Sequence, residues 1–358
     1  MATKVGVWGT GNMGRASLRA VLGHPSLELG ALITSSGAKA GTDAGDFVGL
    51  APTSVAASTD RAELLSSGCR AVAYMASGDI RPDAAAADVE ACLRAGITVV
   101  TPALYALYDP ASAPDELQQA MADACAEGAS SLFVSGVDPG WGNDLLPLLA
   151  TGLSHSITEV RSQEIFDYST YDQEFSVREL VGMGKPMDCE PPMVAPGVPT
   201  MVWGGQIRLL ARSLGVELDR IDEVLDRRVL DADVETRLGR FEAGTQGALR
   251  FEVVGVVDGA PVLVIEHVTR IHPDCAPDWP QPTSGAGTHR IVVTGEPRLE
   301  ITVEAETEGG NRAAGGNATA AMRLVGAIPW LLAEPRGVVD GTEVPVEPGR
   351  GRLVTRPT

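Results

Sequence analysis

The segment Val7-Trp8-Gly9-Thr10-Gly11-Asn12-Met13-Gly14 carries three glycines in the spacing Gly-x-Gly-x-x-Gly. It follows the apolar run Lys4–Trp8 directly and opens the helical pattern of Asn12–Leu22, so it forms the first strand-to-helix turn of the chain. At such a turn the first glycine permits a tight bend, the second lets the backbone approach a pyrophosphate, and the third lets the helix pack on the strand. Free N–H groups at the helix start then face the phosphates. The segment therefore predicts a dinucleotide-binding site rather than a turn without a ligand, formed by Gly9, Thr10, Gly11, Asn12, Met13 and Gly14.

The end of the next predicted strand, Leu27–Thr34, indicates which dinucleotide is bound. NAD-binding proteins usually carry Asp or Glu there, which bonds the ribose 2′-hydroxyl. This chain has Ser35, Ser36 and, slightly later, Lys39, with no carboxylate at the strand end. Hydroxyls and a lysine suit a 2′-phosphate, which a carboxylate would repel. We expect NADP(H) to be preferred and NAD(H) to be possible; the alternative for Lys39 is an ordinary solvated loop residue.

The first 150 residues continue the alternation of short β-branched runs and alanine-rich helical patterns. This alternation predicts a Rossmann-type α/β domain, with a doubly wound parallel sheet and helices on both faces. The further expected strands are Arg70–Ala76, Thr98–Thr101 and Ser131–Ser135, and the further expected helices are Pro82–Arg94 and Pro114–Glu127.

The pattern changes near residue 150, where longer runs of strand composition begin, several of them alternating apolar and polar residues. We expect residues 1–145 to form the dinucleotide-binding domain and residues 146–316 an α+β domain for substrate binding and dimerisation, with a mixed or antiparallel sheet. A C-terminal helix at residues 317–333 is expected to pack back on the first domain. The runs are Ile157–Ile165, Arg220–Val229, Gly247–Val257, Val262–Ile271 and Thr288–Thr302, with helical patterns at Phe175–Met183 and Gln206–Leu214.

Composition excludes several classes of protein. The 28 basic and 47 acidic residues give a formal charge of −19, which would repel a nucleic acid. No apolar run approaches the roughly 20 residues that span a bilayer, and the N-terminal residues do not resemble a signal peptide. The five cysteines contain no Cys-x-x-Cys pair and suit reduced thiols. We expect a cytoplasmic protein that binds neither nucleic acid nor membrane.

Together with the glycine segment, four later segments resemble the dihydrodipicolinate reductase-like family. The resemblance is strongest to the branch that contains 2,4-diaminopentanoate dehydrogenase and native amine dehydrogenases, and it covers nearly the whole chain. It implies NAD(P)-linked reduction of a small molecule, and a homodimer formed through the sheet that supports the active site. The four segments are His24–Leu29, Val177–Gly182, Glu242–Thr245 and Glu266–Arg270.

Two departures from the family pattern bear on the reaction. Dihydrodipicolinate reductase has a His-His pair followed by a lysine, whereas the comparable segment Ser162–Tyr171 has neither. The amine dehydrogenases use a glutamate in the loop that here is Pro102–Asp109, where none stands near the start. We expect hydride transfer to a small ketone, aldehyde or imine, or from the matching amine. The alternatives are an amine dehydrogenase proper, with Glu164 or Asp167 supplying the carboxylate, and a non-catalytic dinucleotide-binding sensor.

Ligands of such a parallel sheet lie beyond the carboxyl ends of its strands, which places Ala76, Ser77 and Pro102 near the cofactor. Hydride transfer also needs a group that polarises the acceptor and often a proton source. Each candidate has a structural alternative: a tyrosine packed with its hydroxyl on backbone, a helix cap at Asn143, or an exposed carboxylate at a sheet edge. The catalytic candidates are Tyr168, Tyr105 and Asp167, and the substrate-binding candidates are Trp141, Asn143, Tyr171, Glu164 and Tyr108.

The histidines do not suggest a metal site. His267 and His272 are five residues apart in a predicted strand, so their side chains point to opposite faces. Neither belongs to a His-Glu-x-x-His arrangement. We interpret both as core or surface residues and expect no metal.

Overall fold

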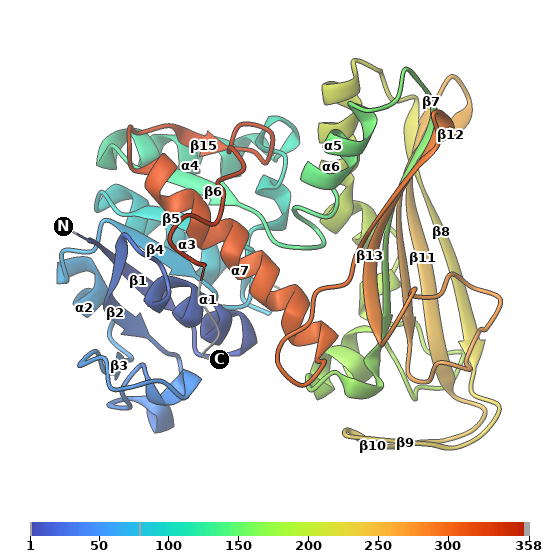
Figure 1. Ribbon diagram of the computed structural model, residues 1–358, viewed down its shortest axis with the longest axis horizontal. Coiled ribbons are helices and arrows are strands. Elements are labelled where there is room, and N and C mark those ends of the chain that lie inside the picture. The colour runs from blue at the N-terminus through green and yellow to red at the C-terminus, as the bar shows by residue number, and fades with distance from the viewer. Residues whose placement is uncertain (1, 79, 354–358) are drawn as a thin grey trace. The chain divides into compact units, whose positions relative to one another are not determined.

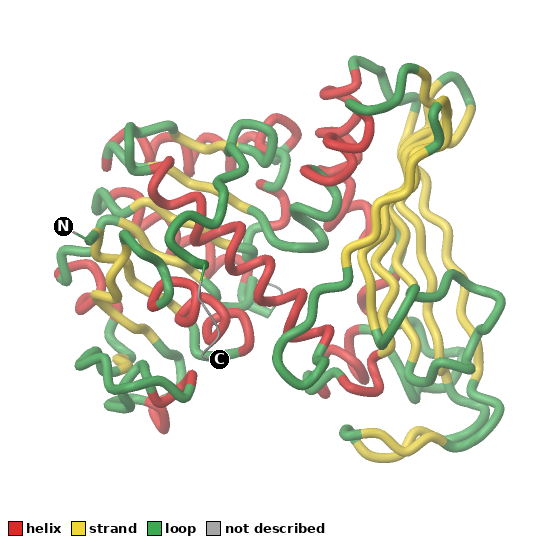
Figure 2. Tube along the Cα trace, viewed as in Figure 1, coloured by secondary structure: helices red, strands yellow, loops and turns green. Residues whose placement is uncertain are grey.

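The computed structural model describes residues 2–78 and 80–353 (Figures 1 and 2). The chain forms two compact units. The first unit comprises Met1–Gly136 together with Asn317–Thr358, and the second unit comprises Val137–Gly316. Within the described residues, no helix combines the length and apolar character that crossing a membrane requires.

A seven-stranded sheet forms the centre of the first unit, in the order β15-β6-β5-β4-β1-β2-β3, and every pairing in it is parallel. The order β3-β2-β1-β4-β5-β6 is that of a dinucleotide-binding sheet, whose ligand site lies between β1 and β4, where the order of the strands reverses. The predicted doubly wound parallel sheet is thus confirmed. The strands are β1 Thr3–Trp8, β2 Leu27–Ile33, β3 Ala57–Ser58, β4 Ala71–Tyr74, β5 Thr98–Thr101, β6 Ser131–Val134 and β15 Gly337–Val339.

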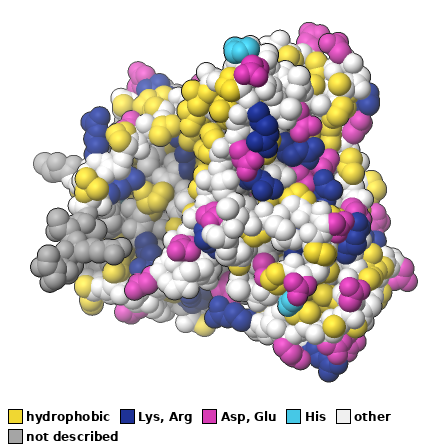
Figure 3. Space-filling model, turned by 45° about the vertical axis from the view of Figure 1, so that its right-hand side comes forward, with side chains coloured by type: hydrophobic (Ala, Val, Ile, Leu, Met, Phe, Trp, Pro, Cys, Tyr) yellow, Lys and Arg dark blue, Asp and Glu magenta, His cyan; other side chains and the backbone are white. Residues whose placement is uncertain are grey.

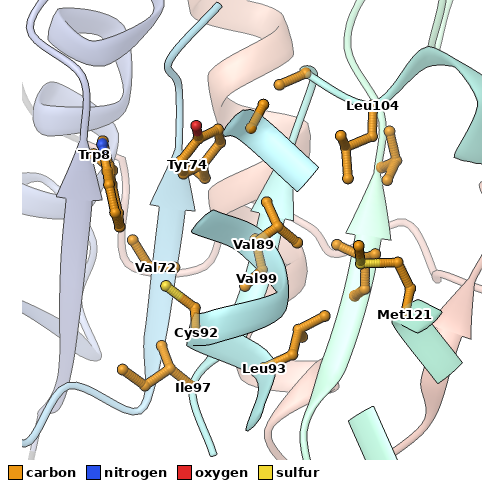
Figure 4. Packing of buried hydrophobic residues seen from close by; sticks show 14 of the residues in the cluster. Trp8, Val72, Tyr74, Val89, Cys92, Leu93, Ile97, Val99, Leu104 and Met121 are labelled. Atoms are coloured by element: carbon orange, nitrogen blue, oxygen red, sulfur yellow. The ribbon is translucent and has the colours of Figure 1, made fainter. Parts of the chain in front are cut away.

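Helices cover both faces of this sheet because its strands are apolar on both sides. On one face, α2, α3 and α4 pack on Val72, Tyr74 and Val99 in the cluster that Figure 4 shows. On the other face, α1 and α7 bury Leu18 and Leu324. The helices are α1 Asn12–Leu22, α2 Arg61–Ser66, α3 Pro82–Arg94, α4 Asp115–Gly128 and α7 Arg312–Leu331.

The second unit contains a six-stranded sheet in the order β14-β13-β7-β12-β11-β8. The pairing of β7 with β12 is parallel and the other four are antiparallel, so the sheet is mixed. Helices α5 Leu145–Thr151 and α6 Val198–Leu214 pack on one face of it. The strands are β7 Ser156–Asp167, β8 Arg220–Val229, β11 Gln246–Val257, β12 Ala260–Arg270, β13 Gly287–Glu296 and β14 Leu299–Val303, and a separate hairpin pairs β9 Val234–Thr236 with β10 Gly239–Phe241.

Two predicted elements differ from the structure. The run Thr288–Thr302 is not one strand but the antiparallel pair β13 and β14, which Pro297 interrupts because it has no N–H for the ladder. The final helix begins at Arg312, ahead of the predicted residue 317. Its early glycine Gly315 reflects close packing rather than a loop, since a Cβ there would clash with the Ala305 carbonyl oxygen.

Candidate active site

The predicted glycine turn lies in the first unit, between the carboxyl end of β1 and the start of α1. Gly9 has φ +126°, and a Cβ on it would lie 2.8 Å from the Met75 carbonyl oxygen. A Cβ on Gly14 would clash with the Gly9 carbonyl oxygen, so the fold itself requires both glycines. Gly11 differs, because a Cβ there meets nothing within 4 Å. Open space above the second glycine is what a pyrophosphate approaching the backbone needs, so these residues fit a dinucleotide.

Polar side chains gather beside this turn at the end of β2. The hydroxyl oxygens of Thr10 and Thr34 lie 2.9 Å apart, and the Ser36 backbone N–H donates to Thr34 Oγ1 at 3.3 Å. Lys39 Nζ lies 3.4 Å from both the carbonyl and the hydroxyl oxygen of Thr10. Ser35 is exposed. Lys39 therefore lies against the glycine turn, and Thr34 is a neighbour that the sequence reasoning missed.

The loops after β4 and β5 touch each other, since a Cβ on Gly78 would clash with the Ala103 carbonyl oxygen. This brings the segments of Ala76, Ser77 and Pro102 to one edge of the sheet; Asp79 lies outside the described residues. Tyr108 is buried and its hydroxyl donates to the Pro102 carbonyl oxygen at 3.3 Å, while its ring stacks on Tyr105 with centroids 6.3 Å apart. The hydroxyl of Tyr108 thus helps to hold the loop, and substrate or proton-transfer roles for the two tyrosines stay predictions.

A buried polar cluster occupies the second unit, with Asp138 at its centre. Asp138 Oδ1 accepts from the indole Nε1 of Trp203 at 2.6 Å and lies 2.9 Å from His267 Nε2. Its Oδ2 accepts from Asn143 Nδ2 at 3.1 Å. The Asp138 side chain is 1% exposed. A carboxylate so far from water needs such partners, because an unpaired buried charge is very costly.

Glu164 connects this pair to a second histidine. Its Oε2 lies 3.2 Å from His289 Nε2, and its Oε1 lies 4.0 Å from His267 Nδ1. Glu164 is the register partner of His267 on β12 and of His289 on β13, so all three side chains point to the same face of the sheet. The Glu164 side chain keeps 16% exposure, whereas both histidines are buried.

Aromatic rings surround the two imidazoles. Phe251 stacks on His267 with centroids 4.7 Å apart, and Trp203 packs on it at 4.5 Å. Trp141 and Phe166 lie 5.5 and 5.3 Å from the His289 ring. These rings exclude water, and the resulting low local dielectric strengthens every charge interaction in the cluster.

Asp138 and His267 shift each other's pKa in opposite directions. Burial by itself would raise the pKa of Asp138, but the charge and hydrogen bond of His267 outweigh it and lower that pKa below its usual value. Burial likewise would lower the pKa of His267, and the attraction and hydrogen bond of Asp138 reverse this and raise it.

The remaining second-unit candidates lie near this cluster in the chain or contact it. Tyr168 packs on Tyr171 with centroids 4.9 Å apart, and burial, followed by the nearby Glu164 carboxylate, raises the pKa of Tyr168 well above its usual value. Asn143 is fully buried and its amide bridges Asp138 and Ser162. Asp167 accepts the Ser169 N–H and caps the turn Tyr168–Thr170, so it has a structural task, and its catalytic role stays a prediction.

One group in the described part of the chain has ligand atoms spaced as for a metal ion, namely Asp138, Glu164 and His267, all within 4.8 Å. Asp138 is not available as a ligand, because Trp203, His267 and Asn143 already direct donors at it. His267 Nδ1 and one carboxylate remain, fewer than the three protein ligands of a typical catalytic zinc site. The cluster is a hydrogen-bonded one.

Comparison with known proteins gives consistent results. Residues 3–102 match the N-terminal domain of dihydrodipicolinate reductase, and residues 143–350 match the C-terminal domain of 2,4-diaminopentanoate dehydrogenase. An amine dehydrogenase from Streptomyces virginiae is 59% identical over 350 residues, which cover 97% of each chain. A 2,4-diaminopentanoate dehydrogenase from Acetoanaerobium sticklandii is 24% identical over 70% of this chain and 67% of its own. The solved amine dehydrogenase from Mycobacterium smegmatis shares the fold, with a TM-score of 0.78 and 20% identity over 98% of both chains.

Fold, glycine turn and relatives together define an NAD(P)-dependent dehydrogenase. More narrowly, the chain belongs to the branch of the dihydrodipicolinate reductase-like family that contains 2,4-diaminopentanoate dehydrogenase and the amine dehydrogenases.

Proposed function

We propose that the protein interconverts a small amine and the corresponding ketone or aldehyde, using NADP(H), and that Glu164 is the carboxylate that binds the amine nitrogen. The observation that carries this proposal is the position of Glu164. It is the partly exposed carboxylate of a buried polar cluster, with His289 and Tyr168 as neighbours. It thus offers the carboxylate that the Pro102–Asp109 loop lacks near its start.

The first unit would hold the cofactor. The backbone around Gly11 and the start of α1 suit the pyrophosphate, and Lys39 with Ser35 and Ser36 suits a 2′-phosphate. When bound, the nicotinamide supplies or accepts the hydride. A preference for NADP(H) over NAD(H), and a cytoplasmic location where this cofactor is available, are parts of the proposal.

The second unit would handle the substrate. Glu164 binds the substrate ammonium and accepts its proton, which leaves the amine neutral and able to lose hydride. The phenol of Tyr168 stays protonated because its pKa is raised, so it donates a hydrogen bond to the carbonyl or hydroxyl oxygen at the reacting carbon. Trp141 and Tyr171 would border an apolar pocket, which favours a small hydrophobic substrate.

The open face of the second unit's sheet would bind a second copy of the chain. This face lies opposite α5 and α6 and carries Val254, Val256 and Val264 beside charged side chains that already pair with one another. Figure 3 shows apolar, basic and acidic side chains interspersed over this part of the surface. Glu266 accepts one hydrogen bond from Arg161 and one from Arg250, each at a different carboxylate oxygen. Burial of this face would therefore leave neither oxygen of Glu266 without a partner.

The test of function is NADPH oxidation with a panel of small ketones and aldehydes, with and without ammonia, repeated with NADH. We expect turnover that requires ammonia and prefers NADPH. Turnover without ammonia would indicate a carbonyl reductase, and cofactor binding without any turnover would indicate a sensor.

The test of the residue is Glu164→Gln, with Glu174→Gln as the matched control at an exposed site on another segment. Loss of general-base catalysis should lower kcat/KM by about 100-fold or more. The control should retain wild-type activity. Equal activities of the two variants would exclude Glu164 as the base.

A further inference from the structure

The Asp138–His267 pair lies behind Glu164 and takes no direct part in the function proposed above. His267 is 6% exposed and enclosed by Trp203 and Phe251. One ring nitrogen, Nε2, points at Asp138, and the other, Nδ1, points toward Glu164. The histidine therefore connects a fully buried carboxylate with a partly exposed one.

We propose that Asp138 and His267 are positioning residues for Glu164: Asp138 holds a second proton on His267, and the charge of the resulting imidazolium, 4.0 Å from Glu164 Oε1, helps to hold that carboxylate in place beside its contact with His289. The inference rests on the proposed role of Glu164 and adds to it the charge of the neighbouring His267.

The hydrogen-bond donors around Asp138 are the first argument. The indole of Trp203 and the amide nitrogen of Asn143 can only donate, so Asp138 must accept from both. Asp138 Oδ1 also lies in hydrogen-bond contact with His267 Nε2. An ionised carboxylate can accept all three hydrogen bonds, so this environment favours the anion of Asp138. A buried anion requires a compensating positive charge nearby, and His267 is in hydrogen-bond contact to supply it.

The charges that face His267 are the second argument. Asp138 faces it from the loop before α5, Glu164 from β7, and Glu266 contributes from β12 itself. Trp203 on α6 and Phe251 on β11 contribute uncharged rings. The surroundings are thus anionic, which favours the imidazolium and accounts for the raised pKa of His267.

The pair also bears on which substrate form is bound. With Asp138 and Glu164 ionised and His267 protonated, the three groups carry a net charge of −1. One cationic substrate, an ammonium or an iminium, neutralises this charge, whereas a neutral carbonyl does not. The cluster would therefore favour iminium over free ketone, which is the discrimination that reductive amination needs.

The direct test is ¹⁵N NMR of the full-length protein labelled at histidine, with His267→Gln identifying the His267 resonances by their loss. At pH 8 we expect both ring nitrogens of His267 to show shifts of protonated nitrogens, with the exposed His272 as the internal reference. Shifts of a neutral ring at that pH would overturn the proposal. This measurement does not depend on turnover, so it stands apart from the test of Glu164.

The functional test compares Asp138→Asn, which removes the charge, with Trp203→Phe, which removes one donor to the same oxygen and keeps the charge. Without the Asp138 charge, His267 should hold one proton instead of two, so its ring nitrogens should show the shifts of a neutral ring at pH 8 in Asp138→Asn, and kcat/KM should fall by about tenfold or more. In Trp203→Phe the His267 nitrogens should keep the shifts of a protonated ring. Protonated shifts or wild-type kcat/KM in a folded Asp138→Asn protein would overturn the proposal, and if that variant does not fold, the NMR result on the wild type decides.

Discussion

The proposed preference for NADP(H) rests on a few side chains around Thr10. Lys39 Nζ approaches both oxygens of Thr10, so its charge lies against the glycine turn. We predict that Lys39→Glu weakens NADPH binding about tenfold or more, because one charge-assisted hydrogen bond is lost and a like charge is gained, while NADH binding changes far less. Fluorescence titration with both nucleotides measures this.

The matched control for this substitution is Lys4→Glu, which makes the same charge change at the start of β1, the opposite end of that strand from the turn. It should leave both affinities near those of the wild type. Equal weakening of NADPH and NADH by Lys39→Glu would show that Lys39 does not contact a 2′-phosphate.

At the scale of elements, the Asp138–His267 pair ties the loop before α5 to strand β12. Because the pKa of Asp138 is lowered on folding, its ionisation contributes to the free energy of unfolding above the usual pKa of about 4. This contribution is lost as the pH falls through the pKa that Asp138 has in the folded protein. Because the pKa of His267 is raised on folding, its protonation contributes fully to the free energy of unfolding below the usual pKa of about 6.5. This contribution is lost as the pH rises through the pKa that His267 has in the folded protein.

We therefore predict that the stability difference between wild type and His267→Gln is largest near pH 5 to 6 and shrinks toward pH 9. Urea unfolding midpoints across this range measure the difference. A difference that does not vary with pH would mean that His267 has the same charge in the folded and unfolded chain.

The sequence predicts elements well where local signals mark both ends. Pro82 and Gly96 bracket α3, and the glycine turn starts α1 at Asn12; both helices have the predicted bounds. The polar cluster has no such local signal. Asp138 and His267 are 129 residues apart, and Glu164 meets His289 only through the pairing of β7 with β13. Strand register over such separations is set by tertiary packing, so sequence alone could name Glu164 but not its partners.

At the scale of the whole molecule, the proposed dimer makes a prediction about mass. Val224 on β8 is 51% exposed on the open sheet face, opposite Glu252. Val224→Glu would set three carboxylates side by side there, with Asp222 and Glu252, so we predict that it converts a dimer of 37.3 kDa chains to monomers. Light scattering after gel filtration measures the mass.

Leu153→Glu is the control, since Leu153 is 60% exposed just after α5, away from that face. This variant should remain dimeric. A wild-type protein that elutes with the mass of one chain would refute the assignment of the open face to a second copy.

The first unit is assembled from two stretches of chain that the second unit separates. Leu324, Val325 and Ile328 of α7 cover Val5, Val7 and Val100, and β15 pairs with the edge strand β6. During synthesis, the ribosome has to make the whole second unit before these covering pieces exist. The nascent N-terminal sheet therefore waits with the part of its apolar face that α7 covers still exposed and with one edge unpaired, a state that is prone to aggregation until α7 and β15 are made.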